Sequence, residues 1–348
     1  MPAVEAHLIL LRAGEHDDSL DTSKLRVHRI QVRNFASPQA PVFVVRTLRR
    51  VRPDLLVSWL HPADIWSYVA TRIVRGVPWV MTERGSQYPD ELAFNLRKRL
   101  GRRAADAIIA NSQQGKQLWQ NLAPRSPVQV ISNMVLGDEI PLDACADRTT
   151  SDVCLFVGRL EPEKNVGAMI TAFTRFAANH PQARLLMAGK GSRASEVIRI
   201  AEEGGVASKV ELLGFRKDVP MLMSRARLFL SFSRYEGMPN VVMEAVASGL
   251  PAVLSDIPEH RALLGDDYPY YVRLDSSPDE TASVMSEAWA HGVTRGDQIY
   301  AHARRTLASM TPARVAAAYV DAFTEVLARA RARRTTAEAK LAAEVWRS

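Results

Sequence analysis

The sequence predicts an α/β protein with two doubly wound domains, each a parallel sheet with helices on both faces. Three observations support this prediction. The chain has 348 residues, more than a single hydrophobic core usually organises. Strand-like apolar runs alternate with amphipathic stretches of helix length, a pattern typical of parallel sheets. The alternation stops at a polar segment, 136–152, and then restarts, which indicates a linker followed by a second domain.

The expected strands form two series, one on each side of that segment. The first series covers 6–11, 54–60, 77–83, 105–111 and 128–133. The second covers 153–160, 183–189, 210–214, 227–233 and 251–256. Helices are expected over 62–76, 164–179, 193–204, 218–225 and 241–249. The domains are therefore placed at 1–140 and 150–312, with two long helices over 313–348.

The composition indicates a globular protein with excess positive charge. Hydrophobic residues make up 47% and charged residues 24% of the chain, which excludes the disordered class. The net charge of +7 and pI of about 9.6 favour an anionic partner: nucleic acid, an acidic membrane surface or a phosphorylated substrate. A general arginine bias without a specific partner explains the charge equally well.

Cysteine content and hydropathy predict a cytoplasmic location. Cys145 and Cys154 have neither metal-binding nor disulfide-framework spacing, which fits a reducing cytosol. No apolar run reaches the roughly 18–20 residues that a membrane-spanning helix needs. Residues 1–18 contain a short apolar strand without a basic leader or cleavage site, so no signal peptide is expected.

Glycines and cations follow the first three strands of the second series. Gly158 allows a tight turn, and Arg159 and Lys164 flank it beside a helix start, where free N–H groups and the helix dipole attract anions. A pyrophosphate suits this place, and two ordinary surface cations are the alternative. The turn at Gly189 resembles a phosphate loop without its full spacing. The turn at 213–215 fits either an exposed backbone that meets a nucleobase or a plain strand-to-helix turn.

Two glutamates flank a Gly-Pro turn in the stretch SRYEGMPNVVMEAVASGLP, residues 233–251. Glu236 is expected on the loop after a strand, and Glu244 one turn into the next helix. Carboxylates there can accept hydrogen bonds from sugar or ribose hydroxyls, and the intervening amides can hold a diphosphate. Alternatively, both are helix-start acids, each stabilised by about 0.3–1 kcal/mol through the helix dipole.

In order and spacing, GRLEPEKN, GKGS, LLGF and SRYEGMPNVVMEAVASGLPAVLSD resemble the donor-binding half of a family 4 glycosyltransferase with the GT-B fold. The likeness is close over 152–265, where Glu236 and Glu244 fit the family's E-x7-E pattern. VSWLHPADIWSYVATRIVRGVPWVMTERGS and ADAIIANS resemble the family's acceptor domain. The resemblance implies two Rossmann-like domains facing a central cleft. It also implies a retaining enzyme without metal or other cofactor, whose donor is a nucleoside-diphosphate sugar, a UDP-sugar rather than a GDP-sugar.

The resemblance further implies a role for each candidate residue. Arg159 and Lys164 would neutralise the donor diphosphate. They would act together with the turn made by Gly237, Met238, Pro239, Asn240 and Val241. The nucleoside would meet Gly158, Gly189, Leu213, Gly214, Phe215 and, at its ribose, Glu244. Glu236 and His61 are the expected catalytic residues at the transferred sugar, although a lone histidine after a strand is also common as a structural residue. Glu83 and Arg84 are expected on the acceptor side.

The implied mechanism is front-face transfer with retention, in which the leaving diphosphate takes the acceptor's proton. No side chain is an obvious nucleophile for double displacement. Compared with the family, one strand, its glycine-rich loop and a helix are missing before residue 6, through a late start codon or a natural truncation. We therefore expect a first-domain sheet without its central strand, and an exposed apolar groove there.

Two basic runs in the first half, 46–52 and 97–103, favour an anionic membrane surface. The second run continues a helix with Leu92, Leu96 and Leu100 on one stripe, which fits either a membrane-bound amphipathic helix or an ordinary core face. With the resemblance, this predicts a peripheral enzyme on the inner face of the plasma membrane. Its acceptor would be lipid-linked or polysaccharide, in envelope or exopolysaccharide synthesis.

The sequence is also compatible with two other functions, and a third lacks support. Nucleic-acid binding lacks support because the sequence has no aromatic platform or reading helix. A truncated sugar-nucleotide-binding protein without turnover, and a GT-B sugar-nucleotide epimerase, are the alternatives that the sequence leaves open.

Overall fold

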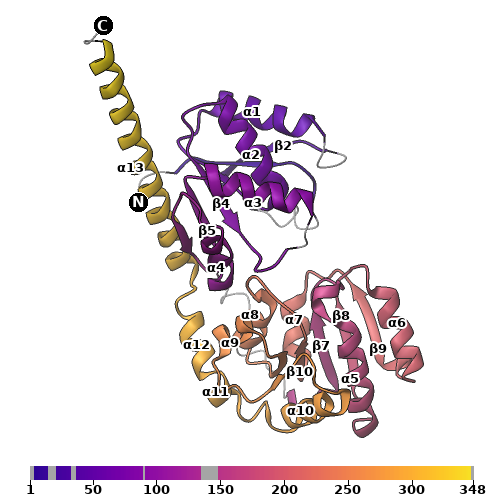
Figure 1. Cartoon of the computed structure of the whole chain (residues 1–348). Coiled ribbons are helices and arrows are strands. Elements are labelled where there is room, and N and C mark those ends of the chain that lie inside the picture. Colours follow the sequence, from indigo (N-terminus) through magenta and orange to yellow (C-terminus); the bar gives the residue numbers. More distant parts are fainter. Residues whose placement is uncertain (1–3, 15–20, 33–36, 89–90, 135–147, 346–348) are drawn as a thin grey trace. The chain divides into compact units, whose positions relative to one another are not determined.

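The computed structural model describes residues 4–14, 21–32, 37–88, 91–134 and 148–345. The chain forms two compact units (Figure 1). Unit 1 contains the chain up to Ile131 and the segment from Ala318 onward, and unit 2 contains residues 132–317. Most of the predicted linker, 136–152, lies outside the described residues. The predicted α/β class is confirmed, because every paired strand in both units is parallel to its neighbours.

Unit 2 has a six-stranded sheet in the order β12-β11-β10-β7-β8-β9. Its strands are β7 (Val153–Val157), β8 (Arg184–Ala188), β9 (Val210–Gly214), β10 (Leu228–Ser231), β11 (Ala252–Ser255) and β12 (Tyr271–Val272). The chain starts in the middle with β7, builds outward to β9, and then returns to place β10 on the other side of β7. This reversal between β7 and β10 is a topological switch point, and ligands of open α/β sheets bind at the carboxyl ends of the strands there.

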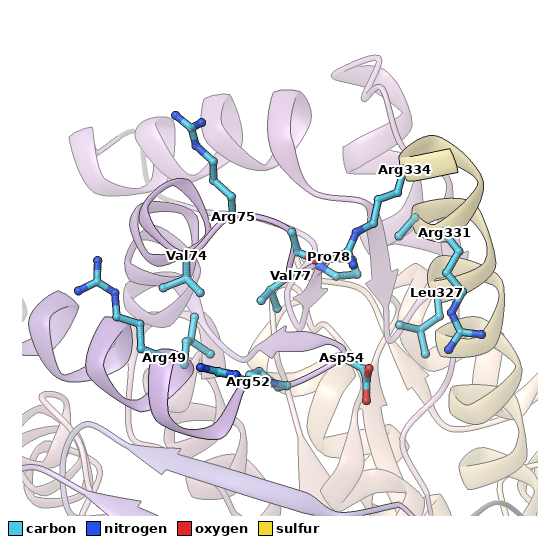
Figure 2. Close-up of a pocket in the computed structure, with 14 residues that line it drawn as sticks. Arg49, Arg52, Asp54, Val74, Arg75, Val77, Pro78, Leu327, Arg331 and Arg334 are labelled. Carbon is cyan, nitrogen blue, oxygen red and sulfur yellow. Dashed lines mark hydrogen bonds between the residues drawn. The ribbon is translucent and has the colours of Figure 1, made fainter. Parts of the chain in front are cut away.

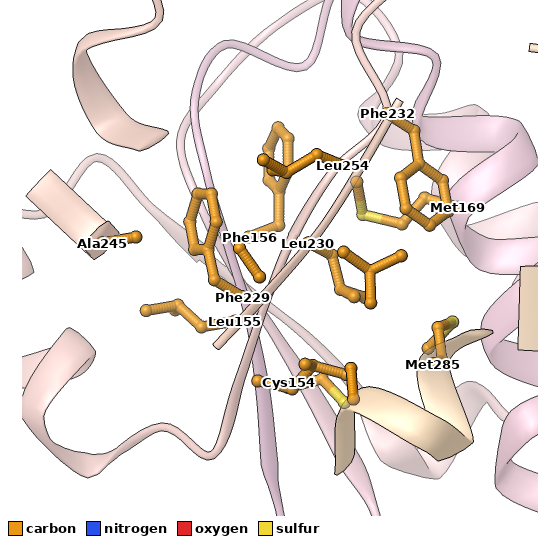
Figure 3. Packing of buried hydrophobic residues seen from close by; sticks show 14 of the residues in the cluster. Cys154, Leu155, Phe156, Met169, Phe229, Leu230, Phe232, Ala245, Leu254 and Met285 are labelled. Atoms are coloured by element: carbon orange, nitrogen blue, oxygen red, sulfur yellow. The ribbon is translucent and has the colours of Figure 1, made fainter. Parts of the chain in front are cut away.

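The helices of unit 2 are α5 (Val166–Asn179), α6 (Ala194–Glu203), α7 (Val219–Arg225), α8 (Asn240–Ala247), α9 (Pro258–Leu264), α10 (Pro278–His291), α11 (Gly296–Ile299) and α12 (Ala301–Leu307). α5 packs against α6 and α10, and α12 packs against α8 and α9. Figure 3 shows the resulting core, in which Met169 of α5 and Met285 of α10 pack with side chains of β7, β10 and β11. Each large apolar side chain buried there contributes about 1.5–3 kcal/mol. One continuous core therefore fixes the strand ends that carry the candidate site.

The parallel sheet of unit 1 is divided into two pieces. β1 (Ala6–Leu10) pairs with β2 (Leu25–Arg29), and a separate sheet has the order β3-β4-β5-β6. Its strands are β3 (Leu56–Ser58), β4 (Trp79–Glu83), β5 (Ala107–Ala110) and β6 (Val128–Val130). The division agrees with the expectation of an interrupted first-domain sheet. Every residue of β1 is half-buried, whereas β4 and β5 are fully buried, so the side chains beside the interruption are partly exposed.

Four helices accompany these strands: α1 (Gln39–Val51), α2 (His61–Ile73), α3 (Leu92–Ala104) and α4 (Gln113–Asn121). Val44 and Leu48 of α1 are buried in a small cluster that Ile9 of β1 and Leu56 of β3 both contact. The two sheet pieces of unit 1 are thus joined by packing under one helix rather than by a strand ladder between β1 and β3.

The expectation of two C-terminal helices is wrong, because the structure has one helix there, α13 (Pro312–Val345; Figure 1). After Pro312 this segment contains no proline or glycine that would end a helix. Thr335 and Thr336 do not interrupt it either, since their hydroxyls donate back to the carbonyls of Arg331 and Ala332. From Ala318 onward α13 belongs to unit 1.

Candidate functional site

Three loops meet at the carboxyl ends of β7, β8 and β9. The N–H of Gly158 donates to the carbonyl of Ala188 (2.9 Å), and the N–H of Gly189 donates to the carbonyl of Gly214 (2.7 Å). A Cβ atom on Gly189 would overlap the carbonyl oxygen of Gly158, so the loops approach closely only because this residue is glycine. The structure therefore brings together Gly158, Gly189 and Gly214, which the sequence analysis placed in one nucleoside site.

Phe215 lies beside these loops, at the end of β9. It follows Gly214, whose φ of 65° turns the chain at the end of β9. The Phe215 ring is half-buried, and the Lys190 ammonium lies 5.9 Å from its centroid. Leu213 is half-buried next to this turn. An aromatic ring, a cation and exposed backbone at one strand end can together contact a base and its phosphate.

The loops after β7 and β10 are joined by an ion pair at the switch point. The Lys164 ammonium lies 2.6 Å from the Glu236 carboxylate, and the Ser233 hydroxyl donates to the same oxygen (2.7 Å). Lys164 ends a short 3-10 turn, Pro162–Lys164, and is followed by the amino end of α5. Lys164 and Glu236 are both half-buried, so a ligand can still reach them. The sequence positions of Lys164 and Glu236 did not show that their side chains would pair.

Further contacts fix the same two loops. The Arg234 N–H donates to the Glu163 carbonyl (2.8 Å), and the Arg234 guanidinium donates to the Asn165 side-chain oxygen (3.0 Å). Arg159 is exposed and pairs with the Glu163 carboxylate (2.5 Å). The predicted pair of diphosphate cations is thus separated in this structure: Lys164 lies beside Glu236, and Arg159 lies one loop turn away on Glu163.

The turn 237–241 is arranged differently from the prediction in one detail. The Asn240 N–H donates to the Met238 carbonyl (2.9 Å), so this amide is not available to a phosphate in this conformation. The Asn240 side-chain oxygen accepts a hydrogen bond from Asn133 (2.7 Å). Gly237, Met238 and Val241 are half-buried and Pro239 is buried. Glu244 is half-buried and lies one turn into α8, as expected from the sequence.

The sequence analysis missed His260, on α9 after β11. Its imidazole is fully buried, and Nδ1 lies 2.8 Å from the Ser255 carbonyl oxygen. Burial lowers the pKa of His260, whereas the nearby Glu236 carboxylate acts in the opposite direction. The Ser255 hydroxyl donates to the Ser233 carbonyl (2.5 Å), which ties this strand end to the Glu236 loop. The only available signal was its place after a strand, which does not by itself indicate a site.

Glu83 does not occupy an open acceptor position. Its side chain is fully buried, and its oxygens accept hydrogen bonds from Arg97 (2.8 Å), Trp119 (2.7 Å) and the Tyr88 hydroxyl. Its carboxylate also accepts from the N–H groups of Arg84 (2.8 Å) and Gly85 (3.0 Å). A carboxylate with this many donors holds the 84–88 turn in place. We therefore assign Glu83 a positioning role instead of the expected contact with an acceptor.

Arg97 links Glu83 to a second buried acid. The Arg97 guanidinium lies 2.6 Å from Asp64, whose other oxygen accepts from the Ser58 hydroxyl (2.5 Å). Burial raises the pKa of the Asp64 carboxyl, and the adjacent Arg97 opposes this effect. Arg97 belongs to the basic run 97–103 that was expected at a membrane, and its burial excludes it from such a contact.

His61 and Arg84 are both held by aromatic rings. His61 is the first residue of α2, and its ring lies 4.6 Å from that of Phe94. Burial lowers the pKa of His61, and the positive charge of Arg97 adds to the effect. The Arg84 guanidinium stacks 3.9 Å from the Trp59 ring centroid and donates to the Tyr319 hydroxyl (2.8 Å). His61 lies where β3 ends, as the sequence analysis expected, while Arg84 is engaged with α13.

Among the described residues, no group of three or more His, Cys, Asp or Glu side chains could hold a metal ion. In the same part of the chain, no helix has the length and apolar character needed to cross a membrane.

Sequence comparisons match both halves of the chain to sugar-transferring enzymes. The family described as "Glycosyl transferases group 1" matches residues 145–295, and "Glycosyltransferase Family 4" matches residues 4–135. An uncharacterized glycosyltransferase of Methanocaldococcus jannaschii is 22% identical, over 66% of this chain and 64% of that protein. The GDP-mannose:cellobiosyl-diphosphopolyprenol alpha-mannosyltransferase of Xanthomonas oryzae is 28% identical, over 58% of this chain and 56% of that protein. The chain thus spans less than two thirds of the length of these relatives.

Among solved structures, HepE of Anabaena in complex with UDP and glucose has the same fold. Its TM-score is 0.79 at 19% identity, and the match covers 92% of this chain and 91% of HepE. Together with the two parallel-sheet units, this likeness shows the GT-B fold that the sequence analysis expected.

Proposed function

Because the chain belongs to glycosyltransferase family 4, we propose that it is a retaining glycosyltransferase. It moves a hexose-type sugar from a nucleoside-diphosphate sugar to a lipid-linked or polysaccharide acceptor in envelope or exopolysaccharide synthesis. The observation that carries the proposal is the pair of Lys164 and Glu236, 2.6 Å apart at the switch point of unit 2. A cation and a carboxylate at one strand end suit a ligand with a diphosphate on one side and sugar hydroxyls on the other.

In this proposal the donor replaces the contact between Lys164 and Glu236. The Lys164 ammonium moves to the diphosphate, and the released Glu236 carboxylate accepts hydrogen bonds from the sugar hydroxyls. Arg159 is exposed on a long side chain and adds positive charge near the same phosphates. Positive side chains and backbone amides then stabilise the leaving diphosphate without a metal ion.

The remaining contacts of the donor follow the strand ends. The base lies along Leu213, Gly214 and Phe215, and Glu244 accepts the ribose hydroxyls. Lys190 lies near the Phe215 ring and adds a cation on this side. His61 of unit 1 meets the transferred sugar. Arg84 stays on the acceptor side through the stack with Trp59, and Glu83 holds the turn that carries it.

The chemical step is a front-face displacement. The acceptor oxygen bonds to the anomeric carbon on the face from which the diphosphate oxygen leaves, so the configuration is retained. The proton of the acceptor hydroxyl passes to the departing diphosphate, and atoms and charge balance without an enzyme nucleophile. Glu236, held by Lys164 and Ser233 in the free protein, orients the sugar and does not form a covalent intermediate.

A UDP-sugar is the proposed donor and a polyprenyl-linked saccharide the proposed acceptor. HepE, which shares the fold, was solved with UDP and glucose. The Xanthomonas relative has GDP-mannose and a cellobiosyl-diphosphopolyprenol in its name. These two proteins support a nucleotide-sugar donor and a lipid-linked acceptor. The choice of UDP over GDP is a further part of the proposal.

The test is an assay of the full chain with UDP-, GDP- and ADP-sugars, with product analysis. We expect one donor to raise the melting temperature, and its nucleoside diphosphate to be released when an acceptor is added. Binding of a donor without transfer or hydrolysis would support the non-catalytic alternative. Conversion of the donor into an epimeric nucleotide sugar would support the epimerase and contradict our proposal.

α3 supports the proposed membrane contact. Leu92 and Leu96 are 85% and 40% exposed, and Leu100 is half-buried, so two of the three leucines in this stripe are exposed. Arg99 and Arg103 are exposed and follow on the same helix face. An apolar stripe beside basic residues suits an anionic bilayer surface. The run 46–52 contributes a second set of exposed arginines on α1.

Replacing both leucines, Leu92→Ser and Leu96→Ser, should weaken binding to anionic vesicles about tenfold or more, since each buried CH2 group contributes about 0.8 kcal/mol. The measurement is co-sedimentation with vesicles that contain phosphatidylglycerol. Ile198→Ser, at an exposed position in unit 2, is the control and should bind as the unchanged protein does. Equal binding by all three proteins would exclude α3 from the membrane contact.

A further inference from the structure

A cavity of about 570 Å³ lies within unit 1, at the amino ends of β3 and β4 (Figure 2). Its walls are the last turn of α1, the segments 52–54 and 74–78, and one face of α13. The candidate donor site, by contrast, lies at the carboxyl ends of the strands in unit 2. The volume of the unit 1 cavity falls in the range of small-molecule sites, about 300–1,000 Å³. The proposed function uses only Arg49 and Arg52 of this lining, as part of the basic run 46–52.

The charge of this cavity is strongly positive. Five arginines line it against a single acid, Asp54. These are Arg49, Arg52, Arg75, Arg331 and Arg334. α1 and α2 both end here, and each helix carboxyl end contributes about half a negative charge. Together with Asp54 the negative contribution is about two charges against five, so a net charge of about +3 remains for a ligand.

The negative carboxyl ends of α1 and α2 do not neutralise all of these arginines. Within the described ranges, Arg49, Arg52, Arg75 and Arg331 make no ion pair with an acidic side chain. Their neighbours on α13 do: Arg329 pairs with Glu325 (3.7 Å), and Arg333 pairs with Asp106 (2.8 Å). Arg329 and Arg333, which lie outside the cavity lining, thus have acidic partners, whereas Arg331 at the cavity has none among the described residues.

Apolar side chains also line the cavity between the arginines: the buried Leu48, and Val74, Val77, Pro78 and Leu327. Apolar neighbours lower the local dielectric constant and strengthen the attraction between arginine and phosphate. Figure 2 shows Arg49 and Arg75 on one side of the cavity, and Arg331 and Arg334 opposite them on α13. The guanidinium groups of Arg49 and Arg75 extend outward there, and these exposed side chains can rotate toward a ligand.

We propose that this cavity binds a ligand with two or more linked phosphate groups. Arginine forms paired hydrogen bonds with phosphate oxygens, and cations on two facing walls require an anion that spans them. A ligand with linked phosphates can contact cations on both walls. Arg334 has a second role here, because its guanidinium also donates to the Gly76 carbonyl and so fixes α13 against the rim.

The probe is inorganic tripolyphosphate, titrated calorimetrically into the full chain at low salt. Both variants below leave the residues of the proposed donor site unchanged, so a difference between them reports on the cavity. The test variant is Arg75→Gln with Arg331→Gln, which removes two charges from opposite walls and leaves Arg334 in place. We expect the Kd of this variant for tripolyphosphate to be about tenfold or more above that of the unchanged protein, since a charge-assisted contact changes affinity by at least that factor. Arg184→Gln with Arg199→Gln, two exposed unit 2 positions, is the control with the same change in net charge and should not alter the Kd.

Two results would overturn the proposal: no binding of tripolyphosphate by the unchanged protein, or equal weakening by the test and control variants. The source of the phosphates is then determined with vesicles of phosphatidylglycerol and cardiolipin. If the ligand is a lipid headgroup, the Arg75/Arg331 variant also loses vesicle binding and tripolyphosphate competes with vesicles. If the ligand is a soluble polyphosphate, vesicle binding is unchanged while tripolyphosphate binding falls. Melting temperatures of both variants check that each remains folded.

Discussion

Two glutamates at strand ends, Glu83 in unit 1 and Glu236 in unit 2, have the same kind of partner and opposite environments. Glu83 pairs with Arg97 at 2.8 Å, and their side chains are 0% and 2% exposed. Glu236 pairs with Lys164 at 2.6 Å, and theirs are 13% and 19% exposed. The first pair is enclosed by further donors, whereas the second is open to a ligand. Position after a strand therefore identifies candidates, and burial separates an enclosed structural ion pair from a candidate binding pair.

The largest expected effect on stability comes from breaking the enclosed pair. Glu83→Gln leaves Arg97 with one acidic partner fewer and points an amide at the Trp119 or Tyr88 donors. Removing one member of a buried pair costs about 3–5 kcal/mol. Urea unfolding followed by tryptophan fluorescence should show this loss. Glu236→Gln is the matched control, with an expected loss below about 1 kcal/mol because its pair is partly solvated. Equal losses of unfolding free energy in the two variants would contradict the distinction between an enclosed and an open ion pair.

A smaller effect is expected from the loop contact that shapes the open site. Gly189→Ala places a Cβ against the Gly158 carbonyl at a φ of 149°, which costs about 1–3 kcal/mol of stability. Because both loops shift, the Kd for the donor should also rise. Gly205→Ala is the control: its φ is 68°, and no atom lies within 4 Å of the added Cβ. It should lose about 1 kcal/mol from backbone strain and leave donor affinity unchanged. Unchanged donor affinity in Gly189→Ala would place the donor elsewhere.

Much of this architecture was predictable because it rests on local patterns. The alternating runs located β7 to β11 and α5 to α8 to within a few residues, since each apolar run must be buried in the sheet. The interrupted sheet of unit 1 was expected from the comparison of its strands with the pattern of the family. The helix α13 was wrongly divided because its alanine-rich pattern gives no clear core face, although the absence of proline and glycine favoured one helix.

The site was predictable only in part, because side-chain partners depend on tertiary packing. The glycines after β7, β8 and β9 could be grouped from their strand positions. Nothing in the sequence showed that Lys164 would pair with Glu236 rather than stay beside Arg159. Nor did it show that Glu83 would be enclosed, since its donors Arg97 and Trp119 come from α3 and α4. His260 was missed for the same reason: its burial arises from packing, not from a motif.

The smallest expected effect concerns pH. Burial lowers the pKa of His260 below its ordinary 6.5, so the folded protein keeps it neutral while the unfolded chain takes up a proton. The contribution of neutral His260 to the free energy of unfolding is therefore fully present above about pH 6.5 and is lost as the pH falls below that value. His260→Asn keeps a donor for the Ser255 carbonyl and removes this titration. Urea midpoints at pH 5.5 and 7.5 should differ less in the variant than in the unchanged protein. The same difference in both would mean that other groups, such as His61 and His180, carry the effect.

The most direct test of the central claim is the rate of sugar transfer by Glu236→Gln, measured with the donor that the unchanged protein uses. If Glu236 orients the sugar at the open end of the site, kcat/KM should fall about 100-fold or more, which corresponds to about 2.7 kcal/mol of transition-state stabilisation. The urea midpoint should stay close to that of the unchanged protein. Transfer at the unchanged rate by a folded Glu236→Gln protein would contradict the account.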